Sequence, residues 1–127
     1  MKKTLLILAI TLSTASYSQL SDDNWSAAVI QCLATNPIDG LCTNSPHGIM
    51  PDWDVSNVDD MSGTFKNRRT FNADISNWDV SNVRLMEKMF YNADDFNQPL
   101  DDWDTGDVII MREMFGKYEH SSADMVF

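Results

Sequence analysis

The sequence predicts a small repeat protein of the α/β class, a short solenoid of stacked coils behind an N-terminal helical cap. Trp-Asp recurs at positions 53, 78 and 103, which sets a period of 25 residues. Residues 53–77 and 78–102 are identical at eleven of 25 positions. A non-repeating segment with the spacing of an amphipathic helix precedes them. A fixed period of this length means that one structural unit stacks on copies of itself.

Residues 1–18 are expected to be a secretory signal peptide. Lys2 and Lys3 precede an apolar run, TLLILAITL, that is too short to span a bilayer, and small residues follow. Cleavage falls before Gln19 or, alternatively, after Ala15. An N-terminal anchor or a buried strand is the competing interpretation. We favour the cleaved signal because the three regions occur in order, so we expect a secreted or cell-surface protein with no later membrane span.

The charge balance bears on the choice of partner. The chain carries a formal net charge of −10. Removal of Lys2 and Lys3 leaves 7 basic and 19 acidic residues, a net charge of −12, which repels phosphate backbones and argues against nucleic-acid binding. We attribute this negative charge to a requirement for solubility and not to attraction of a charged partner. The scarce basic side chains either contact a partner or, as we favour, form ion pairs; they include Lys66, Arg68, Arg69 and Arg84.

Residues 19–52 are predicted to form the N-terminal cap. A helix is expected over residues 22–35, with Asp22 or Asp23 as its N-cap and Asn36-Pro37 at its end. Its apolar face consists of Trp25, Ala28, Val29, Cys32 and Leu33. A solenoid needs an atypical first unit because its first repeat would otherwise expose its core face.

Cys32 and Cys42, with nine residues between them, suggest a disulfide in an exported chain. Such a bond would pin the cap. Two buried thiols are the alternative. A zinc site that uses both cysteines and His47 lacks an obvious fourth ligand.

Three repeats are predicted, at residues 53–77, 78–102 and 103–127, of which the last is degenerate. Each is expected to run from a short strand into one or two helical turns, clearest at 84–90 and 111–115, with extended pieces at 73–77 and 98–102. The predicted core consists of Trp53, Val58, Met61, Phe65, Phe71, Trp78, Val83, Met86, Phe90, Phe96, Trp103, Val108, Met111 and Phe115, with Met125 in the column of Ile75 and Leu100. The polar columns Asp54/Asp79/Asp104, Asn57/Asn82/Asp107 and Asn72/Asn97 are expected to bond turn backbone.

The repeat pattern resembles a known family. The residues that match are WDVSNV at 53–58 and 78–83, Met61 and Met86, Phe65 and Phe90, and Phe-Asn at 71–72 and 96–97. They resemble the BspA-like leucine-rich-repeat surface proteins, whose repeat is also described as a domain of unknown function in mycoplasma-type lipoproteins. The resemblance implies a right-handed leucine-rich-repeat-like solenoid, export to the cell surface, and adhesion or protein binding. It implies no catalytic residue.

The third repeat departs from the pattern at Thr105-Gly106-Asp107 and at Ser121-Ser122. Either the chain is the N-terminal piece of a longer repeat protein, or residues 116–127 are a degenerate cap. We favour the first, because Met125-Val126-Phe127 is not a polar cover.

Carboxylates cluster at Asp52, Asp54, Asp59 and Asp60, and again at Asp101, Asp102, Asp104 and Asp107. They could hold Ca²⁺ across coils, but the EF-hand order is absent, so we favour solvated turn residues. An acid–base pair would need a cleft, which three coils do not offer. His47 and His120 are isolated. We therefore predict no enzyme activity, no catalytic residue, no resident metal and no cofactor.

The function that we expect is an extracellular interaction or adhesion module for a protein or a glycan. One alternative is a structural N-terminal segment of a longer surface stalk, with no binding activity of its own. Another is a calcium-stabilised solenoid.

Overall fold

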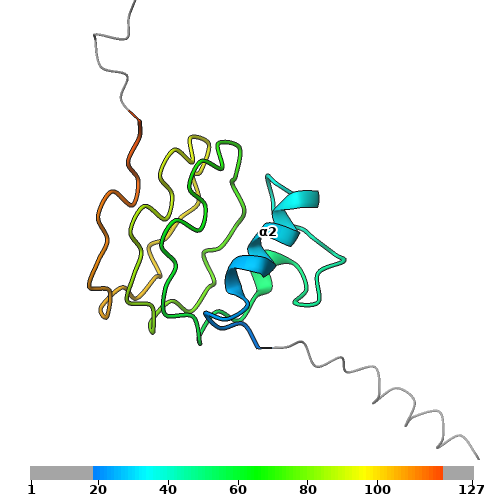
Figure 1. Ribbon diagram of the computed structural model, residues 1–127, viewed down its shortest axis with the longest axis horizontal. Helices are drawn as coiled ribbons and strands as arrows, with labels where there is room; N and C mark the ends of the chain where they lie inside the picture. Colours follow the sequence, from blue (N-terminus) through cyan, green and yellow to red (C-terminus); the bar gives the residue numbers. More distant parts are fainter. Residues whose placement is uncertain (1–18, 119–127) are drawn as a thin grey trace, which may run out of the picture.

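The computed structural model describes residues 19–118, in which a helical segment packs against one end of a stack of looping coils (Figure 1). The expected signal peptide and residues 119–127, which include Met125, lie outside the described residues. The described chain contains one α-helix, α2 (Trp25–Thr35), and one 3-10 turn, η1 (Met50–Asp52).

The predicted α/β class and leucine-rich-repeat-like solenoid are wrong. Residues 19–118 form no sheet and, beyond α2, no further α-helix. Their only parallel pairing in that range consists of two isolated bridges, Asp60 with Leu85 and Leu85 with Ile110. The expected helices at 84–90 and 111–115 are successive turns, and residues 73–77 and 98–102 form no strand.

The reason lies in how the backbone amides of a coil are used. Every second amide donates to the next coil at 2.8–2.9 Å, in the pairs Met61–Leu85, Gly63–Glu87, Phe65–Met89 and Asn67–Tyr91. The amides of Thr64, Lys66 and Arg68 instead bond a carbonyl three residues back in their own coil. An α-helix would need each amide to bond the carbonyl four residues back. The amides that hold the coils together are therefore not free to form a helix.

Left-handed residues mark these turns. Gly63, Lys88 and Glu113 share one column and have φ values of 65°, 56° and 54°. Asn67 and Asn92 share another, with φ of 63° and 57°. Each occupies the third position of a turn closed by a bond across three residues, as in a type II turn. Asn tolerates this conformation, whereas for Lys and Glu it costs on the order of 1–2 kcal/mol.

Aromatic columns fill the interior of the stack. Phe65 lies 5.5 Å from Phe90, which lies 5.3 Å from Phe115 with the rings nearly parallel. Phe71 and Phe96 form a second stacked column at 5.7 Å. Each repeat tryptophan is buried and donates its indole N–H to a backbone carbonyl, in the pairs Trp53–Gly48, Trp78–Met50 and Trp103–Ile75.

The predicted core residues of the first two repeats are buried, except that Phe96 is half-buried. In the third repeat Trp103 is buried and Val108 half-buried, whereas Met111 and Phe115 are 42% and 59% exposed. They are exposed because no described coil lies over them.

The N-terminal segment covers the other end of the stack. Helix α2 buries Trp25, Ala28, Val29, Cys32 and Leu33. The Trp25 ring lies 6.0 Å from that of Trp53 and 5.4 Å from that of Trp78. The predicted disulfide is confirmed: Cys32 and Cys42 are bonded, with Cα atoms 5.2 Å apart, which excludes the free-thiol and zinc alternatives. Gly40 is left-handed, and a Cβ there would lie 2.8 Å from the Cβ of Met50.

Neither Asp22 nor Asp23 is the N-cap: Asn24 holds that position, and the helix begins at Trp25 and not at residue 22. Asp22 instead bonds the first coil, where its Oδ1 accepts the amides of Asp59 and Asp60 at 3.0 and 3.1 Å. One repeat later the carbonyl of Asp59 accepts the amides of Arg84 and Leu85, and one repeat later again the carbonyl of Arg84 accepts those of Ile109 and Ile110. The Asp22 carboxylate thus replaces the carbonyl that a preceding coil would supply.

The aromatic column predicts a graded response to truncation. Phe65→Ala should lower the free energy of unfolding by about 3–5 kcal/mol, because it opens a cavity in a fully buried position. Phe115→Ala, which removes an exposed ring of the same column, should cost less than about 1 kcal/mol. Urea unfolding followed by circular dichroism measures both; equal losses would contradict the stacking account.

Asp22→Ala should lower the free energy of unfolding by about 1 kcal/mol, since two amides lose their acceptor. Asp22→Asn, which keeps an acceptor oxygen, should restore most of it. The exposed neighbour Asp23 supplies the matched control Asp23→Ala. Hydrogen exchange at Asp59 and Asp60 should accelerate only in Asp22→Ala; unchanged exchange there would refute this role.

Candidate binding groove

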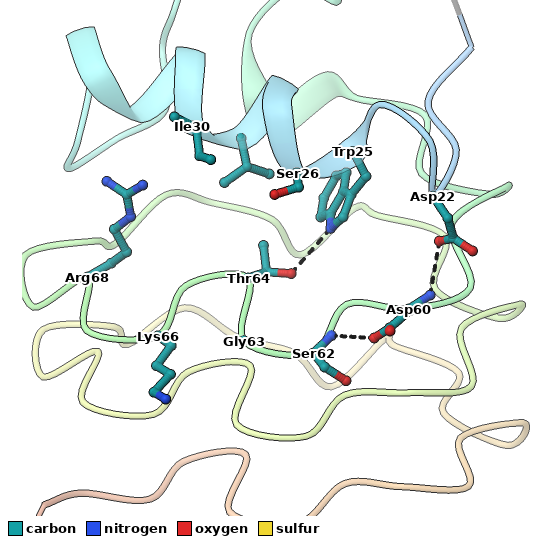
Figure 2. A pocket seen from close by; sticks show the side chains of 11 residues that line it. Asp22, Trp25, Ser26, Ile30, Asp60, Ser62, Gly63, Thr64, Lys66 and Arg68 are labelled. Carbon is teal, nitrogen blue, oxygen red and sulfur yellow. Dashed lines mark hydrogen bonds between the residues drawn. The ribbon is translucent and has the colours of Figure 1, made fainter.

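A groove of about 460 Å³ lies between α2 and the first coil (Figure 2). Its floor is the coil segment 60–68, and its wall is the side of α2 that carries Trp25, Ser26 and Ile30. The indole N–H of Trp25 donates to the hydroxyl of Thr64 at 3.2 Å and ties the wall to the floor. The volume lies within the range typical of ligand sites.

The floor exposes a row of backbone acceptors. In the second coil the carbonyls of Leu85, Glu87, Met89 and Tyr91 each accept an amide from the first coil. One repeat earlier, at Asp60, Ser62, Thr64 and Lys66, no residue of the described chain donates to the corresponding carbonyls. The turns repeat, with left-handed residues in the same columns, so these carbonyls face the groove as their equivalents face the first coil.

The groove also holds the basic side chains that the acidic surface leaves unpaired. Ion pairs one repeat apart join Arg84 to Asp59, Arg69 to Asp94, Arg112 to Glu87 and Lys88 to Glu113, and Lys117 also reaches Asp94. Of the basic residues within 19–118, this leaves Lys66 and Arg68 outside any ion pair, and both line the groove. The ammonium of Lys66 lies 5.9 Å from the centre of the Tyr91 ring in the second coil, and its side chain points away from α2 (Figure 2). The ion-pair interpretation therefore holds for Arg69 and Arg84 and fails for Lys66 and Arg68.

The opposite end of the groove is acidic. Asp22 and Asp60 lie there, and Asp60 accepts the amide of Ser62 at 2.8 Å (Figure 2). The floor thus runs from carboxylates near Asp60 to cationic groups near Arg68.

The aspartates of the repeat bond their own turns. Asp54, Asp74 and Asp79 each accept the hydroxyl and the amide of the serine two residues later. The serine hydroxyl, and then its amide, lower the pKa of each of these carboxyls. Asp104 accepts the amide of Gly106 at 2.9 Å. Throughout residues 19–118, no three His, Cys, Asp or Glu side chains converge in a group that could hold a metal ion.

Ion pairs between neighbouring coils also shift the pKa values of their members. A hydrogen bond from Arg84 lowers the pKa of Asp59 and raises that of Arg84 itself. Glu87 raises the pKa of Arg112 in the same way.

The asparagine columns bond between coils. The Asn82 side chain donates to the carbonyl of Ser56 at 2.9 Å, and the Asn97 amide donates to Asn72 Oδ1 at 2.8 Å. Sequence reasoning missed a further pair, in which Asn92 Nδ2 donates to Asn67 Oδ1 at 2.9 Å. The identity of these residues one repeat apart was the available signal.

His47 is half-buried, with its ring 5.9 Å from that of Trp53. It does not line the groove between α2 and the first coil. His120 lies outside the described residues.

Residues 42–126, about two thirds of the chain, match the family described as "Mycoplasma protein of unknown function, DUF285". The chain belongs to this family. The match supports the mycoplasma-type repeat part of the resemblance and does not extend to the BspA-like leucine-rich-repeat part. No curated protein and no solved structure matches this DUF285 chain significantly.

Within the described part of the DUF285 chain, no helix combines the length and the apolar character needed to cross a bilayer.

The aspartate–serine pairs predict an acid-sensitive contribution to stability. Because the folded-state pKa values of Asp54, Asp74 and Asp79 are depressed, this contribution is complete above the unfolded value near pH 4 and is lost as the pH falls through the folded values. The triple variant S56A/S76A/S81A should therefore melt at a lower temperature at pH 7 and lose less than the parent on acidification.

Thermal melts between pH 2 and pH 7 measure this difference. The exposed Thr70, whose side chain forms no hydrogen bond within the described chain, supplies the control Thr70→Ala, which should follow the parent. Parallel curves for the parent and the triple variant would contradict the assignment.

Proposed function

We propose that this chain is a secreted or cell-surface interaction module that binds an extracellular protein or glycan. The observation that carries the proposal is the groove between α2 and the first coil, where a row of backbone acceptors without donors lies beside Arg68, which forms no ion pair. A row of backbone acceptors without donors is an edge to which a peptide backbone can add.

Two further observations support export and binding. The N-terminal pattern of Lys2, Lys3, the apolar run and small residues is that of a secretory signal. A disulfide within the cap is typical of exported domains. The resemblance to BspA-like surface proteins adds support for an adhesive role.

Binding is favoured over catalysis by the residues of the groove. Its described lining contains neither His nor Cys, and its carboxylates at Asp22 and Asp60 are already bonded to backbone amides. A nucleophile with an adjacent base, the arrangement that acyl or glycosyl transfer requires, is not assembled there.

The alternative is a structural segment of a longer surface stalk. Ile109, Met111 and Phe115 on the third coil are exposed, and a further coil would cover them. This alternative requires no ligand, so a binding measurement separates the two.

The secreted, folded chain, immobilised and exposed to an array of extracellular-matrix proteins and glycans, should bind a subset of them. Chain reduced and alkylated at Cys32 and Cys42 should lose that binding, because the disulfide joins α2, the wall of the groove, to the loop that follows it in the cap. If the folded and alkylated chains gave the same signals, or if neither bound anything, the interaction function would be wrong.

A further inference from the structure

We propose that the groove between α2 and the first coil binds a short peptide with acidic residues at its C-terminal end, which runs parallel to residues 60–68. The peptide takes the position that a preceding coil would hold. This inference rests on the proposed interaction function, for which it names the site and the class of ligand.

The backbone edge supplies the recognition. Each coil receives alternate amides from the coil before it, and the first coil presents the same acceptors without donors at Ser62, Thr64 and Lys66. A peptide that adopts the turn conformation of a coil offers alternate amides to these acceptors, as residues 61–67 do to the second coil. This is the recognition mode in which a peptide completes an unpaired backbone edge.

The direction of the peptide follows from the ladder. Residues 61–67 pair with residues 85–91 in parallel, so a chain in the place of a preceding coil also runs parallel. Its C-terminal end then lies near Lys66 and Arg68, and its N-terminal end near Asp22 and Asp60. Carboxylates at the C-terminal end would meet Arg68, which lacks an ion pair, close to Lys66 at the same end of the groove. Backbone direction and side-chain charge thus select the same orientation.

The cap decides the size of the ligand. Trp25 already covers the tryptophans of the first two coils, and Asp22 already bonds the amides of Asp59 and Asp60. A whole coil from a second copy cannot stack there, whereas the groove leaves room for a single short segment between α2 and the coil edge. Figure 2 shows this space open between Ser26 and Ile30 above and the 62–68 segment below.

The first test uses peptides of known register. The probe is an acetylated peptide of five alternating threonine and valine residues followed by two glutamates. Titrated into the full folded chain, it should shift the backbone resonances of residues 60–68 and of α2. Two further peptides carry N-methyl groups on alternate amides, one on the odd-numbered residues and the other on the even-numbered residues. The peptide whose groove-facing amides are methylated should bind at least tenfold more weakly than the parent peptide, and the other less than threefold more weakly. Equal affinity for both methylated peptides and the parent peptide would overturn the proposal, as would shifts confined to other coils.

The second test reverses the charge. The double variant Lys66→Glu with Arg68→Glu should bind the acidic peptide at least tenfold more weakly than the parent chain. It should bind a peptide that ends in two lysines more tightly than the parent chain does. The matched double variant Arg69→Glu with Arg84→Glu makes the same change in net charge at residues outside the groove and should leave the affinity within about threefold. Equal losses in the two double variants would reduce the effect to net charge and overturn the site.

A third pair of variants fills the groove. Ser26→Trp places a large side chain on the groove wall, whereas Ala27→Trp places it on an exposed position of α2 that does not line the groove. Only Ser26→Trp should abolish peptide binding. Circular dichroism and melting temperature verify the fold of each variant, and the methylated-peptide test needs only the parent chain.

The two proposals fail differently. If the folded chain binds arrayed proteins or glycans and neither Ser26→Trp nor the Lys66/Arg68 double variant changes that binding, the groove assignment is wrong and the interaction function stands. If binding is to glycans alone and the peptide probe does not bind, the ligand class is wrong. If nothing binds the folded chain, both proposals fall.

Discussion

The amide-to-carbonyl bonds that join one coil to the next at every second residue set the geometry of the whole structure. Because Met61, Gly63, Phe65 and Asn67 donate outward, equivalent residues lie over one another and the phenylalanines form continuous columns. The same bonds are accompanied by left-handed residues at two places in each of the first two coils and at Glu113 in the third. A local preference for helix cannot compete, since it amounts to a few tenths of a kcal/mol per residue.

The stacking of repeats and the disulfide could be predicted from the sequence, because the 25-residue period and the cysteine pair are patterns of side chains. The period predicted which residues would lie over one another, and the apolar spacing from Trp25 to Leu33 predicted the buried face of α2. The prediction of helical turns within each coil was wrong because it relied on the helix propensity of residues 84–90. The sequence also contained a signal against helix. Gly63 occupies the same repeat position as Lys88, and four residues later in the repeat Asn67 occupies the same position as Asn92. Gly and Asn at fixed places favour left-handed turns.

The groove itself could not be predicted in the same way. Its acceptors are backbone carbonyls, which leave no trace in the residue pattern, and the role of Asp22 depends on amides 37 and 38 residues away. Lys66 and Arg68 were visible as rare cations in an acidic chain. Only the fold shows that their basic neighbours are neutralised by the adjacent coil, whereas these two are not.

The backbone bonds that join one coil to the next have a mechanical consequence. Under tension, a coil should detach from its neighbour once this row of bonds breaks. Each coil released would lengthen the chain by about 80 Å, the extended length of 25 residues. The Cys32–Cys42 crosslink keeps the loop between those residues from extending. The capped end would thus keep its local structure while the coils beyond it unfold and lengthen the chain.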